Sequence, residues 1–370
     1  MLTPRYLEGA PDAMVELYSE VEADILADMA SRISKYDFFI PAAEHQLRVL
    51  EEMGAEQAYI LRKLAELTGR SEEELRQLFE AAGGKALVSD RADYRRAGLY
   101  PPALNTSQEL QQVLNAGLRQ TQGLFTNLTR TTALDSGGRF RDVLDRAWLQ
   151  VSTGGFDANT AIRGAIKELT RQGLTTVDYS SGRTMSVEAA VRMNVVTGVN
   201  QTALQLQETM ADEMDSDLVE TTAHSGARPS HAKWQGKVFS RSGKSKKYPD
   251  FRRATGYGTG PGLGGWNCRH SFHPYFEGMA RTYGAGELKK LEEKSITYNG
   301  EKLTEYEASQ RQRYMERQIR RWKREQQAMK AAGQPQEEAK AKLKEWRALQ
   351  SDFVEQTGLK RQYDRERVGG

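Results

Sequence analysis

The stretch HSGARPSHAKWQGKVFSRSGKSKKYPDFRRATGYGTGPGLGGWNCRHSFHP, residues 224–274, is the most distinctive part of this 370-residue chain. It contains four of the five histidines and the only cysteine. Its glycines and prolines favour tight turns and close packing of the backbone. Strand-like composition is found at 218–223, 233–240 and 266–274, whereas 240–265 has the composition of a loop. We therefore expect a small, loop-rich α/β-hairpin module at about 217–285.

Helical periodicity precedes this stretch. Apolar residues recur every three or four positions from Met14 to Met29, and Pro41 is expected to open a second helix. A further helix is expected through residues 58–67. The capping-box pattern Ser71–Glu74 predicts the start of another, which Gly83-Gly84 would end.

The middle region, 106–213, also has helical periodicity and follows a breaker at Gly98–Pro102. Within it, Asp157 or Asn159 is expected to cap a helix that Gly173 ends. An extended link at 175–179 follows, and Ser186 is expected to cap the last helix of this region.

Long, polar, basic helices are expected after residue 286, mainly from 308 to 352, with a break at Gly333–Pro335. The predicted fold class is thus α+β and predominantly helical. It divides into an acidic helical region (1–100), a second helical region (101–216), a His/Cys/Gly-rich module (217–285) and a basic helical tail (286–370).

Composition limits the classes of protein to which the chain can belong. Hydrophobic residues make up 38% and mean hydropathy is −0.69, values low for a compact enzyme of this length. A single cysteine excludes an intramolecular disulfide. The sequence predicts neither a membrane span nor a signal peptide, because no run approaches eighteen apolar residues and the first residues lack a basic start with an apolar stretch.

Charge is divided along the chain. Residues 1–80 carry 17 Asp/Glu against 8 Lys/Arg, a net charge of −9, whereas residues 311–370 carry 16 Lys/Arg against 9 Asp/Glu, a net charge of +7. The division indicates either different partners for the two ends or two solvated helical faces.

Five side chains are candidate metal ligands: His224, His231, Cys268, His270 and His273. A Cys/His set of this kind suits tetrahedral zinc, either structural or hydrolytic. The alternative is that these side chains form hydrogen bonds with the backbone of a loop-rich fold. A cysteine nucleophile would also need a histidine base and a third, orienting group. We predict no catalytic residue, no small-molecule substrate and no cofactor, with structural zinc as the alternative.

Two other patterns lie in the same stretch. Gly260–Gly265 matches G-x-G-x-x-G, but neither a preceding strand nor a following helix is predicted, so nucleotide binding is excluded. Basic residues interleave with aromatic ones, a pattern compatible with nucleic-acid contact or with a solvated loop. The candidate contacts are Lys244, Lys246, Lys247, Arg252 and Arg253.

Taken in order, the rarer residues of the stretch resemble the minor capsid proteins of tailed bacteriophages, of the minor capsid protein 2 type and the related Mu-type head-morphogenesis proteins. The residues that carry the resemblance are His224, Gly226, Arg228, His231, Trp234, Gly236, Gly265, Trp266, Asn267, Cys268, Arg269, His270 and Pro274. Related Mu-type proteins commonly have Cys-Arg-Cys where this chain has Cys268-Arg269-His270.

The resemblance implies a structural, non-enzymatic protein of the virion head, made and assembled in the host cytoplasm. It implies association with the portal and major capsid proteins and nonspecific contact with packaged DNA. The alternative function is a zinc- or cysteine-dependent hydrolase, nuclease or toxin-like, centred on residues 224–273.

Overall fold

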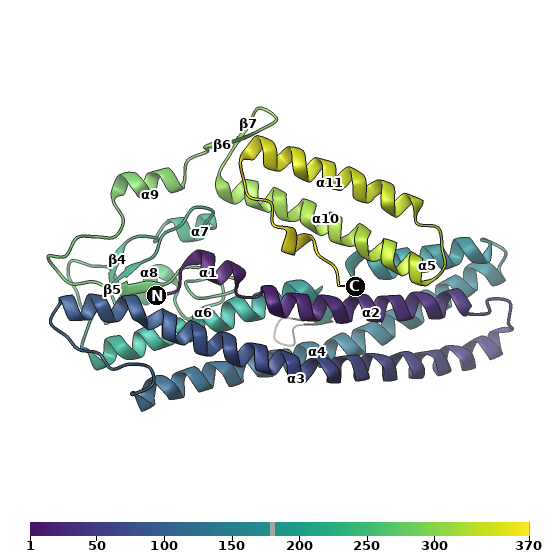
Figure 1. Cartoon of the computed structure of the whole chain (residues 1–370), viewed down its shortest axis with the longest axis horizontal. Coiled ribbons are helices and arrows are strands. Elements are labelled where there is room, and N and C mark those ends of the chain that lie inside the picture. The colour runs from purple at the N-terminus through teal and green to yellow at the C-terminus, as the bar shows by residue number, and fades with distance from the viewer. Residues whose placement is uncertain (178–181, 370) are drawn as a thin grey trace. The chain divides into compact units, whose positions relative to one another are not determined.

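The structure is a computed structural model that describes residues 1–177 and 182–369 (Figure 1). It confirms a predominantly helical α+β fold. The longer helices are α2 (Asp12–Lys35), α3 (Ala42–Arg96), α4 (Gln108–Ser152), α5 (Ala158–Gln172), α6 (Val187–Glu213), α10 (Glu305–Ala331) and α11 (Glu337–Thr357). The short ones are α1 (Pro4–Gly9), α7 (Pro229–Ala232), α8 (Phe251–Thr255), α9 (Ala285–Leu291) and a 3-10 turn at Tyr363–Glu366. Among the described residues, no helix is long and apolar enough to span a membrane.

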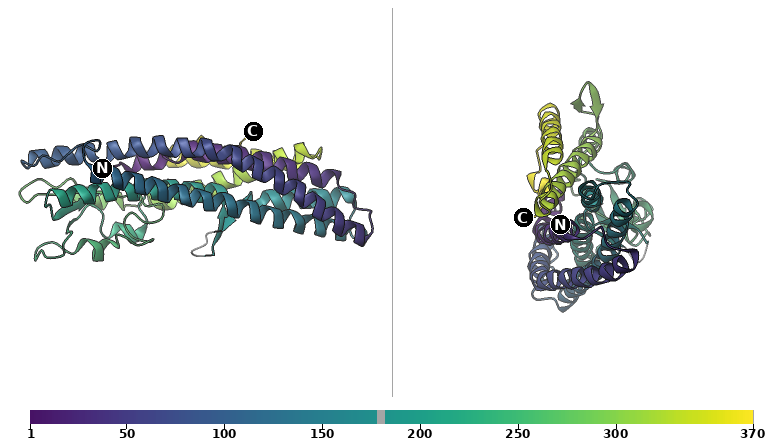
Figure 2. Two further views of the ribbon diagram at one scale, coloured as in Figure 1. Left: turned by 90° about the horizontal axis from the view of Figure 1, so that it is seen from below. Right: turned by 90° about the vertical axis from the view of Figure 1, so that its right-hand side faces the viewer.

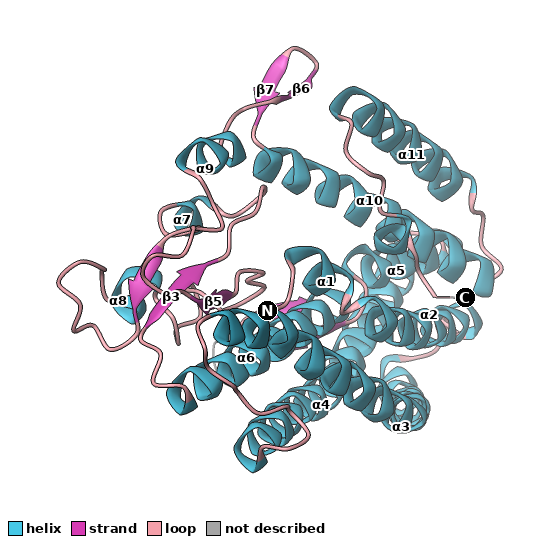
Figure 3. Cartoon of the chain, turned by 60° about the vertical axis from the view of Figure 1, so that its left-hand side comes forward, coloured by secondary structure: helices cyan, strands magenta, loops and turns pink. Residues whose placement is uncertain are grey.

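Within the described parts of the chain, the strands form three small antiparallel sheets (Figure 3). One sheet has the order β4-β3-β5, built from β3 (Leu218–Thr221), β4 (Val238–Ser240) and β5 (Phe272–Pro274). The other two are pairs: β1 (Thr175–Val177) with β2 (Thr184–Ser186), and β6 (Ile296–Tyr298) with β7 (Glu301–Leu303). In the central strand, Val219 lies opposite both Phe239 and Pro274, so part of each predicted strand segment contributes to one sheet. The strands are shorter than predicted, because residues 233–237 and 266–271 are turns and irregular backbone.

The chain packs into two compact units, each made of three separate segments. Unit 1 comprises Met1–Ala13, Glu72–Leu124 and Arg192–Gln310, and unit 2 comprises Met14–Ser71, Phe125–Val191 and Arg311–Gly370. Helices α2, α3, α4, α6 and α10 each contribute residues to both. The division into four consecutive regions remains a prediction.

Helix α3 is longer than its sequence signals indicated. It continues through Ser71, whose hydroxyl donates to the Thr68 carbonyl at 2.9 Å, and through Gly83-Gly84. A Cβ on Gly83 would lie 3.0 Å from the Leu114 side chain, so this glycine admits a neighbouring side chain and does not end the helix. Apolar packing along the helix outweighs the helix cost of about 1 kcal/mol per glycine.

The signals around α5 and α6 behave as predicted. Asp157 caps α5 by accepting from the Thr160 N–H at 3.0 Å, and Gly173 follows the helix with φ 71°. The hydroxyl of Ser186 accepts from the N–H of Ala189 at the start of α6. The extended link at 175–179 is seen as β1, and its residues 178 and 179 lie outside the described residues.

Helices α10 and α11 lie side by side in Figures 1 and 2. Helix α10 is basic as predicted, with eight Lys/Arg against four Glu, whereas α11 has four Lys/Arg against five Asp/Glu, so the prediction of a basic helix is wrong for α11. Within unit 2 they share a small apolar cluster that comprises Ile319, Trp322, Ala339 and Leu343. Two of their arginines form ion pairs inside the unit: Arg324 lies 3.7 Å from Glu22 of α2, and Arg320 lies 2.7 Å from Glu188. Part of the basic charge therefore stabilises unit 2 itself.

In unit 1, α4 and α6 approach closely through two glycine–threonine pairs. A Cβ on Gly117 would lie 1.9 Å from the hydroxyl oxygen of Thr202, and a Cβ on Gly198 would lie 2.2 Å from that of Thr121. No side chain fits at either glycine, so the two backbones can approach closely.

The module has its own apolar core, to which α6 contributes Leu204. The other members of the core are Val219, Trp234, Phe239, Phe251, Leu263 and Phe272. Several short elements were not predicted, among them strand β2, helix α7, helix α8 inside the loop-like 240–265, and the β6–β7 hairpin in a region expected to be helical.

Candidate functional site

Four of the five candidate metal ligands gather in one place beside the β4-β3-β5 sheet. His224 follows β3, His231 lies on α7, and Cys268 and His270 precede β5. His231 and Cys268 are each 2% exposed and His270 is 1% exposed. A short helix that Pro229 begins thus delivers one ligand-type side chain, and an irregular segment delivers two more.

The donor atoms of three of these residues face one another. The Nδ1 atoms of His231 and His270 are 3.4 Å apart, and the Cys268 Sγ lies 3.8 Å and 3.7 Å from them, respectively. All three donor atoms lie within 4.8 Å of one another. The His224 ring lies beside this group, with its centroid 4.3 Å from that of His270.

The outward nitrogen of each imidazole is held by a carbonyl oxygen. His231 Nε2 lies 2.8 Å from the Pro261 carbonyl and His224 Nδ1 lies 2.7 Å from the Ser225 carbonyl. His270 Nε2 lies 3.2 Å from the Gln235 side-chain oxygen, which also accepts the His224 backbone N–H. Since carbonyl oxygens only accept, the outward nitrogens carry the protons and the inward nitrogens present lone pairs.

Burial sets the protonation of these groups. It lowers the pKa of His224 to about 4, lowers that of His231, and lowers that of His270 well below its ordinary value. The same desolvation raises the pKa of the Cys268 thiol. Reactive cysteines have a lowered pKa and solvent access, so these properties argue against a cysteine nucleophile.

Neighbouring side chains hold the cluster in position. Asn200 of α6 donates from Nδ2 to the carbonyls of both Cys268 and His270, at 2.9 Å and 3.0 Å, and is fully buried. The Trp234 ring packs 4.7 Å from the rings of both His231 and His270. Sequence reasoning missed Asn200 and did not assign a role to Gln235.

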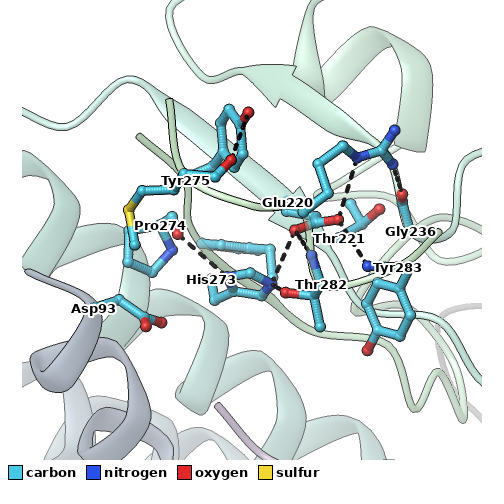
Figure 4. A network of polar contacts seen from close by, with 12 residues as sticks. Asp93, Glu220, Thr221, Gly236, His273, Pro274, Tyr275, Thr282 and Tyr283 are labelled. Carbon is cyan, nitrogen blue, oxygen red and sulfur yellow. Dashed lines mark hydrogen bonds and ion pairs between the residues drawn. The ribbon is translucent and has the colours of Figure 1, made fainter. Parts of the chain in front are cut away.

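His273, the fifth candidate ligand, lies in a different network (Figure 4). Its Nδ1 lies 3.2 Å from the Pro274 carbonyl, and its Nε2 lies 3.1 Å from the Thr282 hydroxyl and 3.7 Å from Glu220. The fully buried Glu220 also accepts the Thr282 N–H at 2.9 Å and pairs with Arg281 at 3.5 Å. This network fastens residues 281–283 to β3.

The remaining residues of the motif have structural contacts. Arg228 donates to the Trp266 carbonyl at 2.7 Å, Arg269 pairs with Glu8 at 3.0 Å, and the Asn267 N–H donates to Thr197. The role of the remaining four, Gly226, Gly236, Gly265 and Pro274, is to set the conformation of the backbone. A Cβ on Gly265 would lie 2.0 Å from the Gly260 carbonyl oxygen, so only glycine fits there. Trp266 is 57% exposed.

All five candidate nucleic-acid contacts are exposed. Two of them have acidic neighbours: Lys247 lies 3.0 Å from Glu277, and Arg252 pairs with Glu208. The others are Lys244, Lys246 and Arg253. Part of this positive charge is therefore offset within unit 1, by Glu277 of the module and Glu208 of α6.

The chain is similar to structural proteins of Lactococcus phages. A structural protein of Lactococcus phage LL-H is 29% identical to this chain over 276 residues. The aligned region covers 70% of this chain and 71% of the phage LL-H protein. A structural protein of Lactococcus phage mv4 is 35% identical to this chain over 116 residues. The aligned region covers 30% of this chain and 86% of the phage mv4 protein. No solved structure matches the chain.

The model of the family "Phage minor capsid protein 2" matches residues 2–355. The chain belongs to this family and is a structural protein of a bacteriophage virion. The match extends the resemblance from the module to nearly the whole length.

Proposed function

We propose that this chain is a minor component of the phage head, which associates with the portal and major capsid proteins during assembly in the host cytoplasm and lies close to the packaged DNA. The observation that carries the proposal is the family match over residues 2–355, because it includes both helical units as well as the module. Long helices with many exposed polar residues suit a protein that docks on other subunits.

The proposed contact with DNA uses the exposed face of α11. Lys340, Lys344 and Arg347 are exposed there beside the exposed carboxylates Glu337, Glu338 and Glu345, whereas other basic residues of 311–370 form ion pairs inside unit 2. Exposed cations spaced along a helix bind phosphates without sequence preference and release counterions. The exposed lysines and arginines of 244–253 form a second candidate contact.

A hydrolase centred on residues 224–273 is the competing function. Its cysteine-dependent form requires that a substrate reach the Cys268 thiol, which is 2% exposed and has a raised pKa. Its zinc-dependent form requires an open coordination position for water. The buried, carbonyl-anchored histidines favour a structural role for the cluster.

Cross-linking of the full-length chain in isolated phage heads, with the cross-linked peptides identified by mass spectrometry, tests the proposal. We expect cross-links to the portal protein and to the major capsid protein. Cross-links to tail proteins alone would contradict it. A tagged host protein expressed during the same infection is the control for nonspecific capture.

A further inference from the structure

The four side chains of the cluster (His224, His231, Cys268 and His270) form a donor set that the head function does not use. We propose that His231, Cys268 and His270, with His224 as the fourth ligand, bind one Zn²⁺ ion that fixes the module as a structural clip. The proposal is independent of the proposed function, since the clip concerns the folding of the module and not its partners.

The spacing of the first three donor atoms fits a tetrahedral ion. Zinc bonds of about 2.0–2.1 Å to nitrogen and about 2.3 Å to sulfur place two nitrogens about 3.3 Å apart and a nitrogen and a sulfur about 3.6 Å apart. The two Nδ1 atoms are separated by 3.4 Å, and the sulfur lies 3.8 Å and 3.7 Å from them. Three edges of the tetrahedron already have about the required length.

Hydrogen bonding alone does not satisfy this arrangement. The Pro261 carbonyl and the Gln235 oxygen hold the protons of His231 and His270 on their outward nitrogens. The two inward Nδ1 atoms are therefore lone pairs facing each other, and the single thiol hydrogen of Cys268 can serve only one of them. A cation bound to both nitrogens and to the thiolate satisfies all three donors.

His224 supplies an independent indication. Its Nε2 is buried and has no hydrogen-bond partner among the described residues, while its Nδ1 proton is held by the Ser225 carbonyl. A buried polar atom without a partner is costly. Its ring must move toward the other three donors to form the fourth bond. That bond would pair the nitrogen.

The chemistry of the donors selects the ion and its role. Thiolate with imidazole favours Zn²⁺, and four protein ligands leave no position for water, which defines a closed structural site. The carbonyls that hold the outward N–H groups orient the ligands from behind. The ion would join the exit of β3, helix α7 and the entry to β5, three segments of a module with a small apolar core.

The test measures metal content and stability of the full-length chain. We expect one zinc per chain after purification without chelator, and a lower melting temperature after a chelator removes it. Cys268→Ser and His270→Gln should lose the zinc. The matched control His273→Gln lies in the same module but outside the cluster, and should retain it.

Each of the following results would overturn the proposal: no stoichiometric zinc even after incubation with Zn²⁺, no response of the melting temperature to the chelator, or equal loss of zinc from the His273→Gln control. Exchange with Co²⁺ in the unmodified chain removes any dependence on folding of the variants. Tetrahedral visible bands with a thiolate charge-transfer band are expected, and octahedral bands alone would contradict the site. His224→Gln should weaken zinc binding by more than about 10-fold; unchanged affinity would remove His224 from the set.

Discussion

Gly117 of α4 offers a direct test of the close approach of α4 to α6, the helix that contributes Leu204 to the apolar core of the module. In Gly117→Ala, the new methyl group would lie 1.9 Å from the Thr202 hydroxyl oxygen and 2.8 Å from its methyl carbon. The threonine is 4% exposed, so the helices must separate or repack. Overpacking of this kind costs about 1–3 kcal/mol, and alanine returns about 1 kcal/mol of helix propensity. We expect a net loss of up to about 2 kcal/mol.

Gly123 of the same helix is the matched control, because nothing lies within 4 Å of a Cβ built there. Gly123→Ala should therefore stabilise the protein, by up to about 1 kcal/mol. Urea unfolding followed by circular dichroism measures both. The double variant Gly117→Ala/Thr202→Ala should recover part of the loss, since the clashing hydroxyl is gone. Equal effects of the two glycine variants, or no recovery in the double variant, would refute the close approach.

Three further predictions concern the buried carboxyl of Glu56, the His/Cys cluster and the exposed cations of helix α11. Burial raises the pKa of Glu56 from 4.5 to about 7. The unfolded chain therefore loses this proton first as pH rises, and the folded state loses stability between those two values. The advantage of Glu56→Gln over the unmodified chain should grow by up to about 2.5 kcal/mol from pH 5 to pH 8 in urea unfolding. A difference that stays constant, or that matches the exposed control Glu51→Gln on the same helix, would contradict this. Gln235→Ala removes the oxygen that holds His270 Nε2 and should weaken zinc binding by about 10–100-fold in competition with a chelating dye, whereas unchanged affinity would show that Gln235 does not orient the ligand. Replacing Lys340, Lys344 and Arg347 together by Gln should reduce the slope of log affinity for duplex DNA against log salt by up to about 3, and an unchanged slope would locate the contact elsewhere.

The helical part of the fold could be predicted in type but less well in extent. Periodicity located the helices, yet Ser71 and Gly83-Gly84 gave local end signals that tertiary packing overrode inside α3. The β6–β7 hairpin had a local signal that was missed. Asn299 and Gly300, with φ 48° and 80°, form a two-residue Asn-Gly turn of the type that favours hairpins.

The candidate site could be predicted only as a group of residue types. Their clustering in sequence indicated that His231, Cys268 and His270 meet. It did not separate His273, whose side-chain partners are Thr282, nine residues along the chain, and Glu220 of β3. Asn200 lay beyond prediction, because nothing in the sequence distinguishes it from the four other amide side chains of α6 (Asn194, Gln201, Gln205 and Gln207). It acquires a role only when α6 packs beneath the module.

The account's central claim is that this chain is a minor structural component of the phage head. The most direct measurement is quantitative mass spectrometry of DNA-filled heads separated from tails, with the major capsid protein as the internal standard. We predict that the chain is present in the head fraction in far fewer copies than the major capsid protein. Its absence from heads, or its presence only in the tail fraction, would contradict the account.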